Sequence, residues 1–157
     1  LLQIILKLLN CSITSIKILT NMLENATFHH IGIAVASIEK VKPFYLSMGY
    51  TVSDIVLEPI QKVYVAYARK DGFPTVEMLE PSDDSSPVKG ILKRNGNTPY
   101  HICYAVDDLT VAIAEMRKNG FRPLSKPVPG HGLDDALMVF LYNVNYGLIQ
   151  VMENIKK

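Results

Sequence analysis

Four polar residues occupy matching places in two similar halves of the chain. Residues 30–35 read His-Ile-Gly-Ile-Ala-Val, and residues 101–106 read His-Ile-Cys-Tyr-Ala-Val. Each copy is followed by a helix-like stretch and then by strand-like segments. The last of these segments carries one polar residue among apolar ones, Glu77 in the first half and Gln150 in the second. Each half therefore offers one imidazole and one side-chain oxygen, which are groups that bind metal ions.

The residues around these four groups favour a shared metal site. Alternation along a strand puts each histidine on the same face as small residues, which leaves room for an ion and its ligand. A buried carboxylate needs a partner, because an unpaired buried charge is very costly. A lone strand histidine is usually structural and a lone edge glutamate is usually solvated, but here the roles recur in both halves. The predicted ligands of a divalent Co, Ni, Zn, Mn or Fe ion are His30, Glu77, His101 and Gln150.

Three further side chains are weaker candidates for a functional role. His29 precedes His30 and is predicted to lie on the opposite face of the strand, where it either supports a ligand from behind or lies at the surface. His131 lies in a loop rich in glycine and proline and is predicted to be a loop residue, with contact to a substrate as the alternative. Cys103 faces the expected cavity, but a small buried apolar residue explains it equally well.

The elements that must position the site follow one order twice. The first half is predicted to hold a strand over 28–35, a helix from Ser37 to Gly49, and strands over 50–57, 62–69 and 75–80. The second half is predicted to hold a strand over 101–106, a helix over 108–119, and strands over 121–124, 137–142 and 147–152. A short helix is predicted after Ser86, with Pro87 at its first position, and 125–135 is predicted to be a long loop. One βαβββ unit cannot bury its own face. Two units should therefore pack as a curved mixed sheet of the α+β class that encloses a cleft.

Chain length and amino-acid composition limit the number of domains and the classes of partner. The 157 residues suit one domain, here divided into module one (28–81), a linker (82–99) and module two (100–153). The charge is balanced and no basic stripe occurs, so nucleic acid is not an expected partner. Two cysteines make no disulfide framework, which favours a reducing compartment such as the cytoplasm.

The first 27 residues are predicted to be an extension outside the functional fold. Residues 1–21 have an amphipathic helical pattern, but polar residues interrupt it at every turn, so no membrane span is expected. The favoured interpretation is an upstream extension, with Met22 starting the functional protein. The alternative is a mitochondrial transit segment, since acidic residues are absent before Glu24.

Residues 28–153 resemble the glyoxalase or vicinal oxygen chelate superfamily. The resemblance is carried by the segments Phe28–Val35, Val76–Pro81, Ser86–Val88 and Tyr100–Asp108. Within the superfamily these segments look most like methylmalonyl-CoA epimerases and small bacterial glyoxalase I-like proteins. The resemblance implies the vicinal oxygen chelate fold, and it places the metal ligands of the family on the four residues named above.

The resemblance also implies a reaction, which is removal of a proton next to a carbonyl group. The resembled enzymes usually have a glutamate at the last ligand position, where this chain has Gln150, and an amide is no base near neutral pH. The strand over 62–69 offers no second acid, so Glu77 is the predicted acid/base. We predict a metal-dependent isomerase or lyase, most like an acyl-CoA epimerase, acting on a small carbonyl or acyl-thioester substrate and forming a homodimer. The alternatives are a glyoxalase I-like lactoylthiol lyase and a non-catalytic small-molecule-binding member of the superfamily.

Overall fold

The computed structural model describes residue 23 and residues 25–155, so the amphipathic segment 1–21 lies outside the described residues. Module one contains β1 (Thr27–Ala34), α2 (Ile38–Ser47), β2 (Thr51–Val52), β3 (Val56–Glu58), β4 (Val63–Arg69) and β5 (Val76–Pro81). The helix α3 (Lys89–Asn95) follows in the connector. Module two contains β6 (Thr98–Val106), α4 (Leu109–Lys118), β7 (Arg122–Pro123), β8 (Val128–Gly130), a 3-10 turn η1 (His131–Leu133), β9 (Ala136–Asn143) and β10 (Gly147–Glu153).

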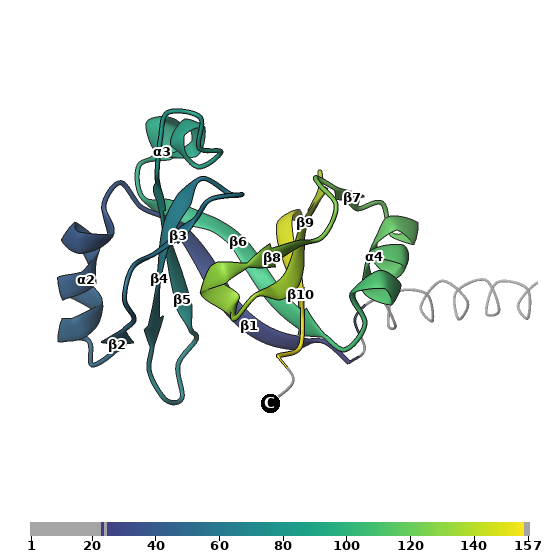
Figure 1. Cartoon of the computed structure of the whole chain (residues 1–157), viewed down its shortest axis with the longest axis horizontal. Helices are drawn as coiled ribbons and strands as arrows, with labels where there is room; N and C mark the ends of the chain where they lie inside the picture. The colour runs from purple at the N-terminus through teal and green to yellow at the C-terminus, as the bar shows by residue number, and fades with distance from the viewer. Residues whose placement is uncertain (1–22, 24, 156–157) are drawn as a thin grey trace, which may run out of the picture.

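The ten strands of the described residues belong to one curved sheet. Its main order is β2-β4-β5-β1-β6-β10-β9-β7, with β3 and β8 pairing β4 and β9 from outside this path. In the centre β1 and β6 run antiparallel, and each has a parallel neighbour from the end of its own module, β5 for β1 and β10 for β6. Figure 1 shows these two long strands joining the modules. The repeated pattern of strands confirms the predicted mixed α+β fold.

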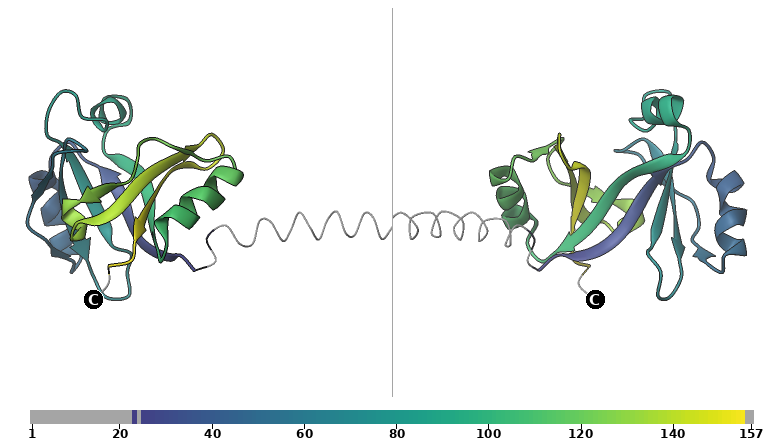
Figure 2. Two further views of the ribbon diagram at one scale, coloured as in Figure 1. Left: turned by 45° about the vertical axis from the view of Figure 1, so that its right-hand side comes forward. Right: turned by 180° about the vertical axis from the view of Figure 1, so that it is seen from behind.

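Helices α2 and α4 lie on the two outer flanks of the sheet, as the two views in Figure 2 show. Each helix packs its apolar side on its own module, α2 through Ile38 and α4 through Leu109 and Met116. A third apolar cluster lies on the inner face and combines residues from both modules. The pairing of the two modules therefore brings together the inward-facing side chains of β1, β4, β5, β6 and β10. Within the described residues, no helix is long and apolar enough to cross a membrane.

Three predicted elements differ from the structure. The strand predicted over 50–57 is divided into β2 and β3, because the hydroxyl of Ser53 accepts the N–H of Tyr67 at 2.9 Å in place of a backbone carbonyl. The loop predicted over 125–135 contains β8 and η1, because β8 forms an antiparallel pair with β9. Helix α3 begins at Lys89, two residues after Pro87.

Candidate metal centre

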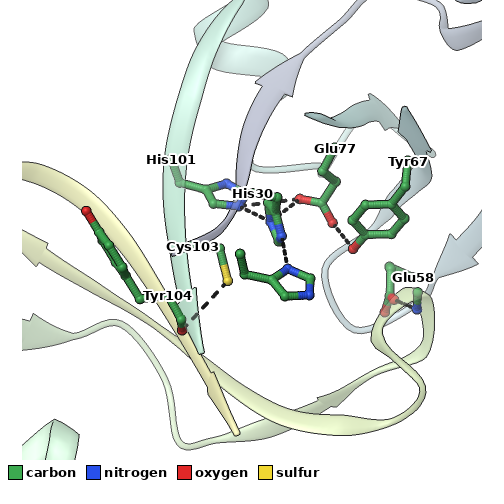
Figure 3. A network of polar contacts seen from close by, with 9 residues as sticks. His30, Glu58, Tyr67, Glu77, His101, Cys103 and Tyr104 are labelled. Carbon is green, nitrogen blue, oxygen red and sulfur yellow. Dashed lines mark hydrogen bonds and ion pairs between the residues drawn. The ribbon is translucent and has the colours of Figure 1, made fainter. Parts of the chain in front are cut away.

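Three side chains from neighbouring strands converge on one point inside the curved sheet. His30 comes from β1, Glu77 from β5 and His101 from β6, and the three are only 0%, 5% and 4% exposed. Oε2 of Glu77 lies 3.3 Å from Nε2 of His30 and 3.4 Å from Nε2 of His101. The two Nε2 atoms are 3.1 Å apart. Figure 3 shows the two rings and the carboxylate facing one another.

These separations match those between ligands of one metal ion. With bonds of about 2.1 Å, two donor atoms lie roughly 3.0 Å apart at right angles and about 3.4 Å apart in a tetrahedron. The three measured separations fall within this range. Two imidazoles and a carboxylate also form a donor set that Zn, Co, Ni, Mn or Fe accepts.

Gly32 allows this convergence. It lies opposite Glu77 in the pairing of β1 with β5 and opposite His101 in the pairing of β1 with β6. A Cβ atom at position 32 would lie only 2.2 Å from Cε1 of His101. The imidazole of His101 therefore occupies the space that any other side chain at this position would need.

Gln150 lies on β10, directly opposite Cys103 of β6. The residue is 1% exposed, and its Oε1 atom has no hydrogen-bond partner among the described residues. Nδ1 of His101 is also buried without such a partner. Buried polar atoms are nearly always paired, so an oxygen left free beside the histidines fits a site that holds a cation. The structure brings His30, Glu77 and His101 together and places Gln150 on the next strand.

Tyr67 of β4 is a part of the site that sequence reasoning missed. Its hydroxyl donates a hydrogen bond of 2.5 Å to Oε1 of Glu77, which leaves Oε2 facing the histidines. Burial and the charge of Glu77 hold the pKa of Tyr67 well above its usual range, so the hydroxyl keeps its proton. The alternation of residues along this strand could have predicted that Tyr67 faces inward, because Tyr67 shares the inner face of β4 with Val63 and Val65.

The environment leaves the donor atoms of Glu77 and His101 unprotonated at neutral pH. Burial works to raise the pKa of Glu77, but His30, His101 and Tyr67 together lower it to about 2. Burial lowers the pKa of His101 to about 4 against the opposing effect of Glu77. A carboxylate and a neutral imidazole are the forms that bind metals.

The metal-free protein should consequently lose stability in mild acid. His101 has a pKa of about 4 when folded and an ordinary value of 6.5, so the unfolded chain binds the proton first as the pH falls. The free energy of unfolding should fall by about 1–3 kcal/mol between pH 6.5 and 4. Urea denaturation of chelator-treated protein at pH 7.5 and 4.5 measures this change. In His101→Asn the difference between the two pH values should shrink, and an equal difference in both proteins would contradict the argument.

Glu58, the last residue of β3, is a second buried carboxylate that the sequence did not reveal. It is 3% exposed, lies opposite Val63 of β4 and accepts a hydrogen bond from the backbone N–H of Gly132. In Figure 3 the ring of Tyr67 lies between Glu58 and Glu77, and both carboxylates contribute to the raised pKa of Tyr67. The strand over 62–69, the expected place of a second acid, holds none. Glu58 lies on the preceding strand, and only the pairing of β3 with β4 turns it inward.

The predicted position of His29 is wrong, while Cys103 and His131 lie as expected. His29 lies on the same side of β1 as His30, with the two Nδ1 atoms 2.7 Å apart, because a bulge interrupts the alternation. Cys103 is buried on the inner face, and burial raises the pKa of its thiol far above the usual value. His131 is on the surface in η1, where Nδ1 lies 2.7 Å from Oδ1 of Asp135.

An apolar cavity of about 240 Å³ lies on the inner side of the sheet. Both modules and the connector contribute to its wall, including Leu79, Val88 and Val128. Tyr100 and Phe140 also line it, and the centroids of their rings lie 5.5 Å and 5.1 Å from that of His101. The rings of Tyr100 and Phe140 therefore lie between the cavity and the imidazole of His101, and the apolar cavity can take an uncharged part of a ligand.

Comparisons with known proteins agree with this fold. Residues 29–140 match the family model of the glyoxalase/bleomycin resistance protein/dioxygenase superfamily. The human mitochondrial methylmalonyl-CoA epimerase is 32% identical over 125 residues, which cover 78% of this chain and 70% of that protein. The structure of a hypothetical protein from Bacillus halodurans has a TM-score of 0.76 and 30% identity, and the match covers 85% of this chain and 97% of that one.

A methylmalonyl-CoA epimerase of Streptomyces coelicolor, solved in complex with 2-nitronate-propionyl-CoA, is also similar. Its TM-score is 0.71 at 26% identity, and the match covers 82% of this chain and 97% of that one. The chain therefore belongs to the glyoxalase/bleomycin resistance protein/dioxygenase superfamily, as its resemblance predicted. Relatives named as methylmalonyl-CoA epimerases come from human, mouse, cattle and Dictyostelium.

Proposed function

We propose that this chain is a metal-dependent epimerase of an acyl-CoA thioester, with methylmalonyl-CoA as the leading substrate. The observation that carries the proposal is the convergence of His30, Glu77 and His101 at a buried point, with an apolar cavity on the other side of the aromatic rings that contact His101. The similarity to named epimerases supports the same reaction. A nitronate is a planar anion that resembles an enolate, so the Streptomyces complex also fits a reaction that removes a proton next to a carbonyl.

The ion would be held by Nε2 of His30, Nε2 of His101 and Oε2 of Glu77, with Oε1 of Gln150 as a fourth ligand. A divalent ion bound there supplies a Lewis acid for the thioester carbonyl oxygen, which makes the neighbouring carbon more acidic. Because Gln150 is neutral, Glu77 is the only carboxylate in this ligand set. The donor set suits several metals, and the identity of the ion stays a prediction.

The protein residues account for the movement of the proton. Glu77 is ionised at neutral pH and can accept the proton on the carbon next to the carbonyl. Tyr67 holds the other oxygen of this carboxylate and so fixes its orientation. Epimerisation then needs a proton delivered to the opposite face of the planar carbon, and Glu58 is the second buried carboxylate near Tyr67. We assign Glu58 this role. In the reverse direction the two carboxylates exchange their tasks.

The apolar cavity suits the uncharged part of the substrate. Its wall is formed mainly by aliphatic and aromatic side chains, which can cover the acyl thioester and exclude water. Exclusion of water strengthens the electrostatic interactions on which proton removal depends. The predicted homodimer and the predicted cytoplasmic location, with its mitochondrial alternative, stay predictions.

The decisive experiment incubates metal-loaded protein with one epimer of methylmalonyl-CoA in deuterium oxide. We expect deuterium at carbon 2 of the substrate and formation of the other epimer, measured by mass spectrometry and chiral analysis. Elemental analysis of the purified protein should give about one divalent ion per chain. Protein that binds one ion but leaves the substrate undeuterated would overturn the proposal. Turnover of a methylglyoxal–thiol adduct instead would favour the lactoylthiol lyase.

The role of Glu58 has a test of its own. Glu58→Gln should lower epimerisation by about 10²–10³-fold, because proton delivery on one face loses its acid. Exchange of deuterium into the epimer whose proton faces Glu77 should continue, since that exchange needs only Glu77. Measurement of exchange and inversion in the same sample separates the two steps. Equal loss of both, at unchanged folding and metal content, would show that Glu58 has a different role.

A further inference from the structure

Two β-bulges lie next to the two histidines of the candidate centre. In the pairing of β1 with β6, Phe28 lies opposite Tyr104 and His30 lies opposite Cys103, so His29 is an extra residue on β1. Further along, Gly32 lies opposite His101 and Ile33 lies opposite Pro99, so Tyr100 is an extra residue on β6. Each bulge therefore falls on the residue that precedes a histidine of the centre. Bulges redirect side chains and are frequent beside active sites.

The bulge in β1 brings His29 against His30. The two rings meet edge to face with centroids 5.0 Å apart, and their Nδ1 atoms are 2.7 Å apart. His29 is half-buried, whereas His30 is fully buried. His30 thus has its Nε2 atom directed at Glu77 and His101 and its Nδ1 atom directed at His29.

Together with metal binding at Nε2 of His30, this contact determines which nitrogen of each ring carries a proton. A neutral imidazole has one N–H, and the nitrogen that binds a metal must be the other one. If Nε2 of His30 binds the ion, Nδ1 of His30 carries the hydrogen and donates it. Nδ1 of His29 is then the acceptor, and His29 carries its own hydrogen on Nε2. We propose that His29 is a positioning residue, which fixes the tautomer and the ring orientation of His30 for metal binding.

The second half of the chain lacks this arrangement. Tyr100 occupies the corresponding bulge, but it meets His101 only through its ring, at a centroid separation of 5.5 Å. Nδ1 of His101 has no hydrogen-bond partner among the described residues. The two rings therefore differ on their Nδ1 sides: Nδ1 of His30 contacts His29, whereas the ring of His101 packs against Tyr100 and Phe140.

A separate ion held by His29, His30 and Cys103 is a weaker interpretation of the same cluster. These three residues do offer ligand atoms within 4.8 Å of one another. However, such an ion would need the lone pair on Nδ1 of His30, and the thiol of Cys103 would have to ionise against a strongly raised pKa. The hydrogen bond between the two histidines needs neither change.

The test compares the Zn²⁺ affinity of the natural protein with that of three variants, by competition with a chromophoric chelator. His29→Phe keeps a ring but removes the acceptor, and its dissociation constant should rise about 10–100-fold. His29→Asn places an amide oxygen where Nδ1 lay and should restore most of the affinity. His131→Phe, at an exposed histidine of η1 outside the centre, should leave the affinity within about twofold. Equal affinity in His29→Phe and the natural protein would overturn the inference.

A second measurement needs no variant and so avoids any question of folding. Long-range ¹H–¹⁵N correlation spectra of the Zn²⁺-loaded protein should show a protonated Nδ1 in His30 and an unprotonated Nδ1 in His29. Protonated Nδ1 atoms in both rings would contradict the assignment. The inference rests on the metal centre of the proposed function, and the two fail in different ways. If the natural protein binds no divalent ion, the proposed centre fails. If it binds the ion with Nδ1 protonated in both rings, or if His29→Phe binds it as tightly, only the role of His29 fails.

Discussion

Replacing Glu77 with glutamine is expected to lower kcat for epimerisation by about 10³–10⁴-fold, within the range known for loss of a general base. The amide has the shape of the carboxylate and keeps an oxygen for the ion, but it cannot accept the substrate proton. The amide NH2 group then faces Tyr67, whose hydroxyl oxygen can accept a hydrogen bond from it, so the fold should be retained. The rate of deuterium exchange into methylmalonyl-CoA and the metal content should be measured on the same preparation.

Gln150→Glu is the matched control for this experiment. It adds a carboxylate on β10 and keeps Glu77, so the protein should remain active and bind its ion at least as tightly. The double variant Glu77→Gln/Gln150→Glu exchanges the two groups and tests whether a carboxylate at either position suffices. Full activity in Glu77→Gln alone would show that another group removes the proton.

Replacing Gly32 with alanine is expected to disrupt the centre although no proposed metal ligand is itself replaced. The new Cβ would lie 2.2 Å from the ring of His101, a distance at which one of the two must move. The ring cannot shift freely, because Tyr100 and Phe140 pack against it. We expect a loss of about 1–3 kcal/mol in the free energy of unfolding and a rise of about 100-fold in the dissociation constant for Zn²⁺.

The chain offers a matched glycine for comparison. A Cβ at Gly90, in helix α3, would meet only Arg94 at 3.6 Å, which is an ordinary contact. Gly90→Ala should therefore leave Zn²⁺ binding unchanged and add up to about 1 kcal/mol of stability. Thermal unfolding and chelator competition report both quantities. Equal metal affinity in the two alanine variants would mean that His101 does not occupy the position that binds the ion.

Much of this molecule follows from local patterns in the sequence. The repeated His-Ile segments and their alternation predict which side chains of β1 and β6 face inward, since side-chain direction along a regular strand depends only on position. The two-fold repetition of βαβββ likewise predicts the α+β sheet, because one unit alone cannot bury its apolar face. These inferences required no knowledge of which strands pair. They correctly placed His30, Cys103 and His101 on the inner face.

The remaining features depend on pairing between segments that are distant along the chain. His29 turns inward because β6 forces an extra residue into β1, and alternation within β1 contains no trace of that bulge. Glu58 and Tyr67 join the site through the pairing of β3 with β4 and of β4 with β5. The sequence by itself determined the two modules and the residue types of the centre. Only the tertiary structure decided which polar groups surround that centre, because strand register is fixed by hydrogen bonds and packing across the sheet and not by neighbours along the chain.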